Sequence, residues 1–410
     1  MYTFQLQVCF LGGAVIDRFT GRFDRRDLLR GSFLAGGVWL AGFDKVRSHW
    51  PAEWQSTKTA LSGKMVGVVD FAGEARVPMG EAFGAELDGR LYTDLSTLSI
   101  ENPVTANEHF YIRTRASRLL DNTKPWAIQL SGLIEKPFAI SVQDLKRMSS
   151  PMGLHLMECA GNTRNAQFGM ISAASWTGAT LADVLARATA KPEASRVLIS
   201  GFDSYTTRSA SSIPGASWVF TAEELERTGA FLATEMNGSP LTRDHGSPVR
   251  LVVPGWYGCT SIKWVDEIIF TDDSVTATSQ MQEYAARTMQ NGVPPVAREY
   301  QPATIEQAAM PIRIEKWAAN EKISYRVVGI AWGGSVPVKK LQIRFNPEEE
   351  YVDVSDFQRT VNDPWGFWTH AWAPKQPGTY TIRLRVADPV VPARRLDAGY
   401  YMRTVEISEI

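Results

Sequence analysis

The sequence predicts an α+β fold in which a mixed domain of strands and short helices is followed by an all-β sandwich domain. Between about residues 100 and 275, alternating strand patterns are interrupted by two helix-capping signatures. After about residue 300, short alternating strands continue without a long helical period, which is typical of a sandwich. A chain of 410 residues is long enough for two such domains and an end segment.

Composition and charge exclude several classes of protein. With 44% hydrophobic and 21% charged residues the chain is not largely disordered, and a formal net charge of −1 gives no overall electrostatic case for a nucleic-acid partner. Three cysteines, none in a CxxC pair, exclude a disulfide framework, a c-type haem attachment and a four-thiolate metal site. Special chemistry must therefore come from one thiol, from five histidines or from a cofactor held mainly by other groups.

The first 55 residues are expected to be a twin-arginine export signal and leader. Arg25-Arg26 and the following LLR precede a weakly apolar run, Gly31–Phe43, that is rich in glycine and alanine. This run is too short for a transmembrane helix, which needs about 20 residues. An amphipathic surface helix is the alternative. The export interpretation places the mature start near residues 44–60, discards Cys9 and predicts a periplasmic protein.

The mixed domain is expected to occupy residues 70–295. Thr180 and Thr221 are each followed three positions later by an acidic residue, Asp183 and Glu224, and this spacing predicts a helix start at each threonine. Alternating or apolar runs predict strands at Trp126–Ile134, Val249–Val253 and Ile262–Phe270.

The sandwich domain is expected to occupy residues 300–410, after a proline-containing boundary at 292–302. Short alternating runs separated by turn residues predict strands at Ile323–Trp332, Val338–Phe345 and Thr379–Val386. Four tryptophans of this region are assigned to the core rather than to a site: Trp332, Trp365, Trp368 and Trp372.

Cys159 lies at the end of an alternating strand and begins the sequence CAGN. The small residues after it allow the backbone to turn closely around whatever the thiol meets. Arg164, five positions later, would place positive charge beside the sulfur and favour the thiolate. The alternative is a buried cysteine that acts only as a small hydrophobic residue.

Two further segments carry clustered positive charge. Arg113 and Arg115, two positions apart on an apparent strand at Asn107–Arg115, would share a face that meets an anion, unless this is a solvated edge strand. In the second segment, basic residues flank the glycine-rich turn at 254–258. His245 and Arg250 precede this turn and Lys263 follows it, an arrangement that would suit a phosphate.

These motifs together resemble the sulfite oxidase family of molybdenum-cofactor (molybdopterin) oxidoreductases, in an exported form without a haem domain. CAGN with its later arginine, RDHGxPVR at 243–250 and VPGxxGxxxxKW at 253–264 occur in the family's order, and the resemblance extends from about residue 70 to the C-terminus. It implies a sulfite-oxidase-type molybdopterin-binding domain followed by an immunoglobulin-like dimerisation domain, and therefore a homodimer.

The resemblance assigns roles to individual residues. It makes Cys159 the thiolate ligand of molybdenum, with the remaining ligands supplied by the cofactor. It makes Arg113 and Arg164 the arginines that face the substrate oxyanion, and Tyr284 the active-site tyrosine. It implies that the pterin and its phosphate are held by Tyr111, Ile112, Arg113, Thr114, Arg115, Cys159, Asp203, His245, Arg250, Ser261, Ile262 and Lys263.

The sequence also departs from the family pattern. Only Arg164 remains of an arginine pair often found after CAGN, and Arg115 stands where vertebrate-like members have histidine. Phe168 is the candidate for an aromatic residue of the pocket wall, and Arg394 or Arg395 for a further substrate arginine from the C-terminal domain. These departures affect the expected substrate more than the expected cofactor.

The resemblance implies oxidation of sulfite to sulfate, with electrons passed to an external acceptor such as a c-type cytochrome. No haem is expected in this chain. One alternative is a related molybdopterin oxidoreductase that acts on sulfane sulfur or on a sulfoxide, although the sulfoxide reductases of this superfamily usually lack a β-sandwich domain. The other alternative is a non-catalytic protein on the same scaffold, in which the thiol only packs.

Overall fold

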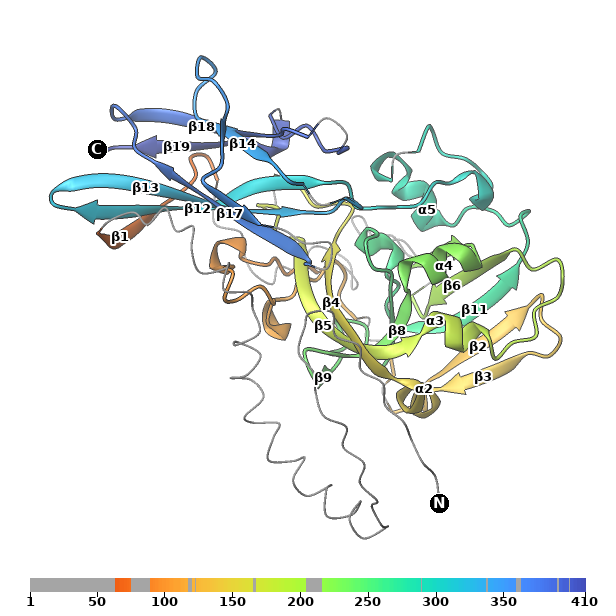
Figure 1. The fold of residues 1–410 in the computed structure, drawn as a ribbon. Coiled ribbons are helices and arrows are strands. Elements are labelled where there is room, and N and C mark those ends of the chain that lie inside the picture. The colour runs from red at the N-terminus through yellow and green to blue at the C-terminus, as the bar shows by residue number, and fades with distance from the viewer. Residues whose placement is uncertain are drawn as a thin grey trace, which may run out of the picture. The chain divides into compact units, whose positions relative to one another are not determined.

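Four β-sheets joined by short helices make up the described part of the chain in the computed structural model (Figure 1). The structure describes residues 63–74, 89–116, 120–121, 123–164, 167–203, 216–288, 290–336, 338–358, 363–388, 391–397 and 399–410. The expected export segment and Cys9 lie outside these ranges. Among the helices within them, none combines the length and the apolar content needed to cross a bilayer.

The sheet that carries Cys159 at one end has the strand order β10-β8-β5-β4, with β9 beside β8, and all its pairs are antiparallel. The ladder between the last two strands closes with Glu158 opposite Ile171, so Cys159 leaves the sheet directly after its last pair. The strands are β4 (Ser150–Glu158), β5 (Ile171–Thr180), β8 (Phe231–Met236), β9 (Ser239–Pro240) and β10 (Arg250–Val252). The expected strands before Cys159 and around Val249–Val253 are therefore confirmed.

A second sheet completes the mixed α/β part of the chain. Its order is β3-β2-β11-β6-β7, and only the pair of β2 with β11 is parallel. The strands are β2 (Ala127–Gly132), β3 (Phe138–Ser141), β6 (Arg196–Gly201), β7 (Ser217–Phe220) and β11 (Val265–Thr271). The strands expected near Trp126–Ile134 and Ile262–Phe270 are confirmed with shorter bounds.

Two of the described helices, α3 and α4, begin where the capping signatures place them. Thr221 accepts a hydrogen bond from the Glu224 backbone N–H (3.0 Å), and the Glu224 carboxylate accepts one from the Thr221 N–H (2.8 Å). Thr180 caps its helix through the Asp183 N–H (3.2 Å). The described α-helices are α2 (Val142–Met148), α3 (Leu181–Leu185), α4 (Ala222–Thr228) and α5 (Ser279–Glu283).

After residue 300 the described chain forms two sheets with the orders β1-β12-β13-β17-β16 and β15-β14-β18-β19. The early strand β1 joins the first sheet by antiparallel pairing with β12. The expected strands are confirmed, whereas the immunoglobulin-like classification and the domain boundary stay predictions. The bounds are β1 (Lys64–Val69), β12 (Ala308–Ala319), β13 (Lys322–Trp332), β14 (Leu341–Arg344), β15 (Val352–Asp353), β16 (Asp356–Gln358), β17 (Trp365–Trp372), β18 (Gly378–Val386) and β19 (Arg403–Ile407).

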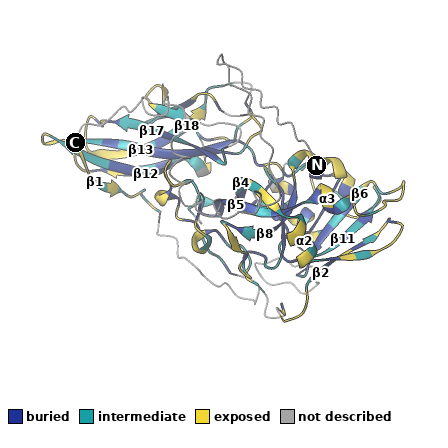
Figure 2. Cartoon of the chain, turned by 60° about the horizontal axis from the view of Figure 1, so that its bottom comes forward, coloured by how far each residue is buried: buried dark blue, intermediate teal, exposed yellow. Residues whose placement is uncertain are grey.

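Aromatic side chains pack these two sheets against each other. The Trp372 ring stacks on Phe345 with centroids 4.1 Å apart and meets the edge of Tyr380 at 4.9 Å. All four tryptophans assigned to the core from the sequence are buried. Figure 2 shows buried residues along much of β12 and β13, with intermediate and exposed residues toward the turn that joins these two strands.

Candidate active site

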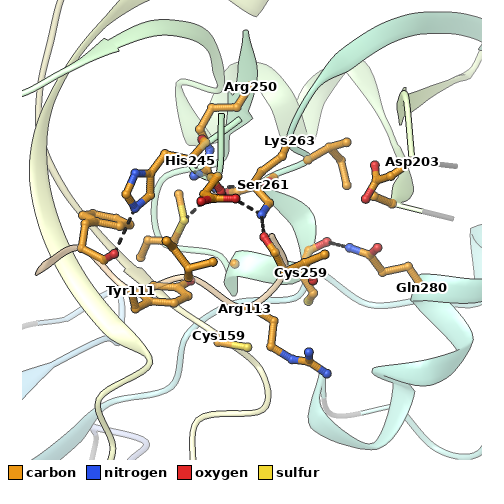
Figure 3. A pocket seen from close by; sticks show the side chains of 18 of the residues that line it. Tyr111, Arg113, Cys159, Asp203, His245, Arg250, Cys259, Ser261, Lys263 and Gln280 are labelled. Atoms are coloured by element: carbon orange, nitrogen blue, oxygen red, sulfur yellow. Dashed lines mark hydrogen bonds between the residues drawn. The ribbon is translucent and has the colours of Figure 1, made fainter. Parts of the chain in front are cut away.

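A pocket with an empty volume of about 800 Å³, including the solvent at its mouth, contains most of the residues expected from the sequence (Figure 3). They come from the segment after η4 (Asn107–His109), from the end of β4 and β6, from the approach to β10 and from the turn that contains η6 (Gly258–Thr260). The expected residues in its lining are Tyr111, Ile112, Arg113, Thr114, Cys159, Asp203, His245, Arg250, Ser261, Ile262, Lys263 and Tyr284.

Cys159 is held at the pocket wall by a tight turn. Its backbone N–H donates to the Met170 carbonyl (2.9 Å), and its carbonyl accepts from the Asn162 N–H (2.9 Å). The Gly161 N–H points at the Cys159 sulfur, 3.4 Å away. The sulfur therefore faces the pocket with one backbone donor already directed at it.

Burial raises the pKa of the Cys159 thiol, while the nearby Arg113 guanidinium and the Gly161 N–H act in the opposite direction. Cys159 is buried, with 5% of its surface exposed to solvent. A group that binds the sulfur as thiolate must displace this proton, and a metal ion does so readily.

Arg250 and Lys263 form a buried cationic wall. The Arg250 guanidinium donates to the carbonyls of His245 (3.1 Å) and Ser261 (3.2 Å), but its Nε has no partner among the described residues. Lys263 donates to the carbonyls of Asp244 (3.0 Å) and Thr114. Burial and the neighbouring Arg250 charge lower the pKa of Lys263 to about 7. An anion in this part of the pocket would restore the charged form of the lysine.

His245 is neutral in this setting. Its Nε2 donates to the Phe110 carbonyl (3.0 Å), and Nδ1 therefore accepts from the Thr242 hydroxyl (2.8 Å). Burial, with smaller contributions from the Arg250 and Lys263 charges, lowers the pKa of His245 to about 4. The ring supports the wall without adding a charge to it.

Asp203 is a buried carboxylate at the far side of Lys263 (Figure 3). Burial raises the pKa of Asp203 to about 7, and the Lys263 charge partly offsets this effect. Its Oδ1 has no hydrogen-bond partner within the described ranges. An unpartnered buried acceptor beside a cationic wall suits a ligand that carries N–H donors as well as an anion.

Two tyrosines that stay protonated also line the pocket. Burial raises the pKa values of Tyr111 and Tyr284 well above the usual range, so each hydroxyl is available as a donor. Gly258 lets the Tyr111 hydroxyl approach, because a Cβ at this glycine would lie 2.5 Å from that oxygen. Gln280 donates to the Cys259 carbonyl and fixes the turn behind the second thiol.

Two of the expected residues do not line the pocket. Arg115 is exposed, with its aliphatic stem against Gly89. Arg164 lies with its Nε 3.9 Å from the Glu74 carboxylate and is 39% exposed. Their roles toward the cofactor and the oxyanion stay predictions.

The strand expected at Asn107–Arg115 is wrong. Asn107–His109 forms the 3₁₀ turn η4, and Ile112 makes only an isolated bridge with Leu91. The physical reason is that side chains satisfy this backbone: the Tyr111 N–H donates to the Ser172 hydroxyl (3.0 Å) instead of to a strand. Without a continuous strand, arginines two positions apart need not share a face, and only Arg113 lines the pocket.

Three further candidates, two arginines of the C-terminal part and the pocket-wall aromatic Phe168, also lie outside the pocket lining. Arg394 binds the carboxylate of Glu158, and the exposed Arg395 pairs with Asp397 (3.1 Å). Phe168 is buried and stacks on Tyr401, with ring centroids 5.4 Å apart. None of these three candidates lines the pocket.

Sequence reasoning missed Gln280 in the wall and the role of Glu158 behind Cys159, whereas Gly258 belongs to the glycine-rich turn that it singled out. A glutamate directly before the cysteine, at the end of a largely apolar strand, was a usable signal for Glu158, because a buried charge requires a partner. No sequence signal identifies that partner, which lies 236 positions away.

The donor set fits a molybdenum–molybdopterin cofactor. Within the described ranges, no group of three or more histidine, cysteine, aspartate or glutamate side chains converges to hold a metal ion. Two thiols, Cys159 and Cys259, line the pocket, and a site with so few protein ligands suits a metal that brings most of its ligands with it. The buried cations, with the unpartnered Arg250 Nε and Asp203 Oδ1, suit the phosphate and the heterocycle of such a cofactor.

Comparison with known proteins agrees with this geometry. The family model described as an oxidoreductase molybdopterin binding domain matches residues 116–279. The match leaves out the segment 111–115 and Tyr284, and it includes Cys159, Asp203, His245, Arg250 and Lys263.

Curated relatives match over part of their length. The NADPH nitrate reductase of Aspergillus niger is 32% identical over 197 residues, which cover 43% of this chain and 22% of that protein. The mitochondrial sulfite oxidase of Macaca fascicularis is 33% identical over 206 residues, which cover 46% of this chain and 36% of that protein. The chain thus spans well under two thirds of these relatives.

One solved structure resembles most of the fold. The crystal structure of the sulfane dehydrogenase SoxCD from Paracoccus pantotrophus superposes with a TM-score of 0.60 at 18% identity. The match covers 81% of this chain and 90% of that chain. At this identity the match establishes likeness of fold.

Proposed function

The chain belongs to the sulfite oxidase family of molybdenum-cofactor oxidoreductases, and from this premise we propose that it oxidises sulfite to sulfate and passes the electrons to an external acceptor such as a c-type cytochrome. The observation that carries the proposal is the placement of the Cys159 sulfur and the Arg113 guanidinium on one pocket. A soft metal ligand and a cation for an oxyanion are the two groups that this reaction requires of the protein.

When bound, the molybdenum cofactor supplies the two-electron redox chemistry and the oxygen transfer. Cys159 would hold the metal, and the buried wall of His245, Arg250 and Lys263 would hold the pterin and its phosphate. Arg113 would bind and orient the sulfite oxyanion, a positional and electrostatic contribution. Tyr284 stays protonated because burial raises its pKa, and it would donate a hydrogen bond to a substrate oxygen.

Oxidation of sulfane sulfur is the second candidate. Arg164, which would add a second charge for a dianion, lies outside the pocket lining and near Glu74. The pocket lining therefore lacks one of the two arginines that the resemblance assigns to the sulfite oxyanion, and this weakens the preference for sulfite over another sulfur substrate. The fold likeness to a sulfane dehydrogenase is compatible with this candidate.

Turnover of the purified, molybdenum-loaded protein with an artificial acceptor tests the proposal. We expect sulfite to give the highest kcat/KM, thiosulfate to give a lower value, and methionine sulfoxide with a reduced donor to give no turnover. Faster turnover of thiosulfate would favour the second candidate. A protein that binds molybdenum but turns over none of the three substrates would contradict both.

We also propose export by the twin-arginine route and a two-fold homodimer. Arg25-Arg26 ahead of the glycine- and alanine-rich run supports export. The resemblance of the strands after residue 300 to a dimerisation domain supports the homodimer, and two-fold dimers are the commonest closed assemblies.

A further inference from the structure

A buried ion pair links the strand end that carries Cys159 to the C-terminal part of the chain. The Arg394 guanidinium binds the Glu158 carboxylate in bidentate fashion, at 3.0 Å to Oε1 and 2.9 Å to Oε2. The two side chains are 10% and 2% exposed. Glu158 is the last residue of β4 and directly precedes Cys159.

Hydrogen bonds with three aromatic side chains hold this pair further. Trp332 on β13 donates to the Glu158 Oε2 (2.8 Å). The hydroxyls of Tyr401 and Tyr257 each accept from Arg394 at 2.7 Å. The positions of the carboxylate and the guanidinium are therefore restrained by residues on both sides of residue 300.

The pair is poorly explained as a stabilising contact alone. Removing two charges from water costs several kcal/mol per ion, so apolar residues of similar volume often stabilise a fold as well as a buried pair. A buried pair of this kind supplies a fixed geometry. The side chain whose direction this geometry would fix is that of the neighbouring residue, Cys159.

The backbone transmits the restraint directly. Glu158 is the last residue of β4 and Cys159 is the first residue of the turn that follows, so fixing the Glu158 side chain restrains the backbone from which the Cys159 side chain leaves. Asn162 adds a second link, because its Nδ2 donates to the Glu158 Oε1 (3.4 Å) and its Oδ1 accepts from the Met170 N–H (3.1 Å). Tyr401, an Arg394 partner, also stacks on Phe168 in the same loop.

We propose that Glu158 and Arg394 are positioning residues that set the direction of the Cys159 sulfur toward the bound metal, and that the C-terminal sheets act on the reaction through this pair. The proposal rests on the proposed function in one respect, which is that Cys159 binds the molybdenum. Arg394 therefore acts through Glu158 and not on substrate.

Three variants of the full chain test the proposal: Glu158→Gln, Arg394→Gln and the double substitution. The matched control is Glu315→Gln, because Glu315 is also a buried glutamate paired with two arginines, Arg313 (2.9 Å) and Arg326 (2.5 Å), on β12 and β13. For each variant we would measure molybdenum per chain, Tm, kcat per bound molybdenum, KM, and the electron paramagnetic resonance spectrum of molybdenum after chemical reduction.

We expect each single variant to lower kcat per bound molybdenum at least tenfold with KM changed less than twofold, because loss of a partner that orients a metal ligand has effects of this size. The resonance spectrum should change in the same variants. The double variant should lose no more than the worse single variant, since the pair acts as a unit. Glu315→Gln should lower Tm and leave both readouts unchanged.

The proposal would be overturned if Glu158→Gln and Arg394→Gln lowered Tm as Glu315→Gln does and left kcat per molybdenum and the spectrum unchanged. If they do not fold, Tyr401→Phe decides, since it removes only one 2.7 Å hydrogen bond from Arg394. An unchanged spectrum in that variant would count against the proposal and an altered one would support it. The reductant, and not the substrate, produces the molybdenum state that gives the resonance spectrum. The spectrum therefore tests this proposal even if sulfite is not the substrate.

Discussion

At the scale of single residues, burial decides the charge that the pocket presents. His245 and Lys263 both lie in the cationic wall, and burial lowers the pKa of each, to about 4 and about 7. Arg250 therefore carries the most persistent charge of the wall, although burial lowers its pKa to about 10. The wall is most positive below neutral pH, where Lys263 is protonated.

The first prediction concerns pH-dependent stability. The pKa of His245 is about 4 in the folded chain and about 6.5 when unfolded, so the unfolded chain binds more protons between these values. The free energy of unfolding therefore falls by about 3 kcal/mol as the pH drops from 6.5 to 4. In denaturant titrations of the cofactor-free chain, His245→Gln should flatten this slope. The exposed His109→Gln should keep it, and an equal slope in all three proteins would refute the assignment.

The second prediction separates the two strand arginines of the sequence analysis. Arg113 lines the pocket and Arg115 is exposed outside it. Loss of one charged hydrogen bond to the oxyanion costs about 2 kcal/mol, so Arg113→Gln should lower kcat/KM for sulfite about 30-fold. Arg115→Gln, the matched control, should stay within about twofold of the wild type. Equal losses in both variants would place the oxyanion elsewhere.

Several site residues could be predicted from the sequence because short motifs carry them. CAGN, RDHGxPVR and the glycine-rich turn fixed Cys159, His245, Arg250 and Lys263 as candidates, and all four line one pocket. Arg164 does not line this pocket, although a motif also carries it. Its position in the motif does not reveal that the Glu74 carboxylate lies beside its guanidinium.

At the scale of elements, turns decide where the site residues point. The turn after β4 aims the Cys159 sulfur, and the turn at η6 brings Gly258 against the Tyr111 hydroxyl. Capping and strand alternation are local signals, and they predicted the starts of α3 and α4 and the strands β2, β4, β10, β11, β13, β14 and β18. The Asn107–Arg115 segment was misread because a hydroxyl from β5, 61 positions away, satisfies its backbone.

The third prediction tests the turn at Gly258. A Cβ at this position would lie 2.5 Å from the Tyr111 hydroxyl and 3.3 Å from the Glu158 carbonyl. The buried Tyr111 ring stacks on Phe110, so Gly258→Ala must displace packed groups, at a cost of about 1–3 kcal/mol. We expect thermal unfolding to show a lower Tm and metal analysis to show less molybdenum per chain.

The control for this variant is Gly67→Ala on β1, where a Cβ would meet nothing within 4 Å. This substitution should leave molybdenum content unchanged. A Gly258→Ala protein with wild-type Tm and full molybdenum would show that the close approach to Tyr111 does not shape the pocket.

At the scale of the whole molecule, contacts distant in sequence join the Cys159 turn to the C-terminal sheets. Glu158 binds Arg394, and Glu74, next to Arg164, binds Arg403 of β19. Sequence patterns predicted a mixed part and an all-β part, but not these links. Pairing across more than 200 positions leaves no periodic or spacing signal that a single sequence can show.

The fourth prediction concerns export, which depends on residues outside the described ranges. If Arg25-Arg26 belong to a twin-arginine signal, Arg25→Lys with Arg26→Lys should leave folded, cofactor-loaded protein in the cytoplasm. Cell fractionation followed by molybdenum analysis measures this. The matched control is Arg18→Lys, which lies ahead of the signal and should be exported normally. Undiminished periplasmic recovery of the double variant would contradict the export proposal.

The fifth prediction addresses the central claim, that the chain carries a molybdenum cofactor through the Cys159 thiolate. Molybdenum X-ray absorption should show one fewer sulfur neighbour in Cys159→Ser than in the wild type, because a hydroxyl replaces a soft thiolate poorly. Turnover should be lost while the fold is kept. Cys259→Ser, at the other pocket thiol, should keep the full sulfur count and most of the activity. An unchanged sulfur count with near-normal turnover in Cys159→Ser would contradict the account.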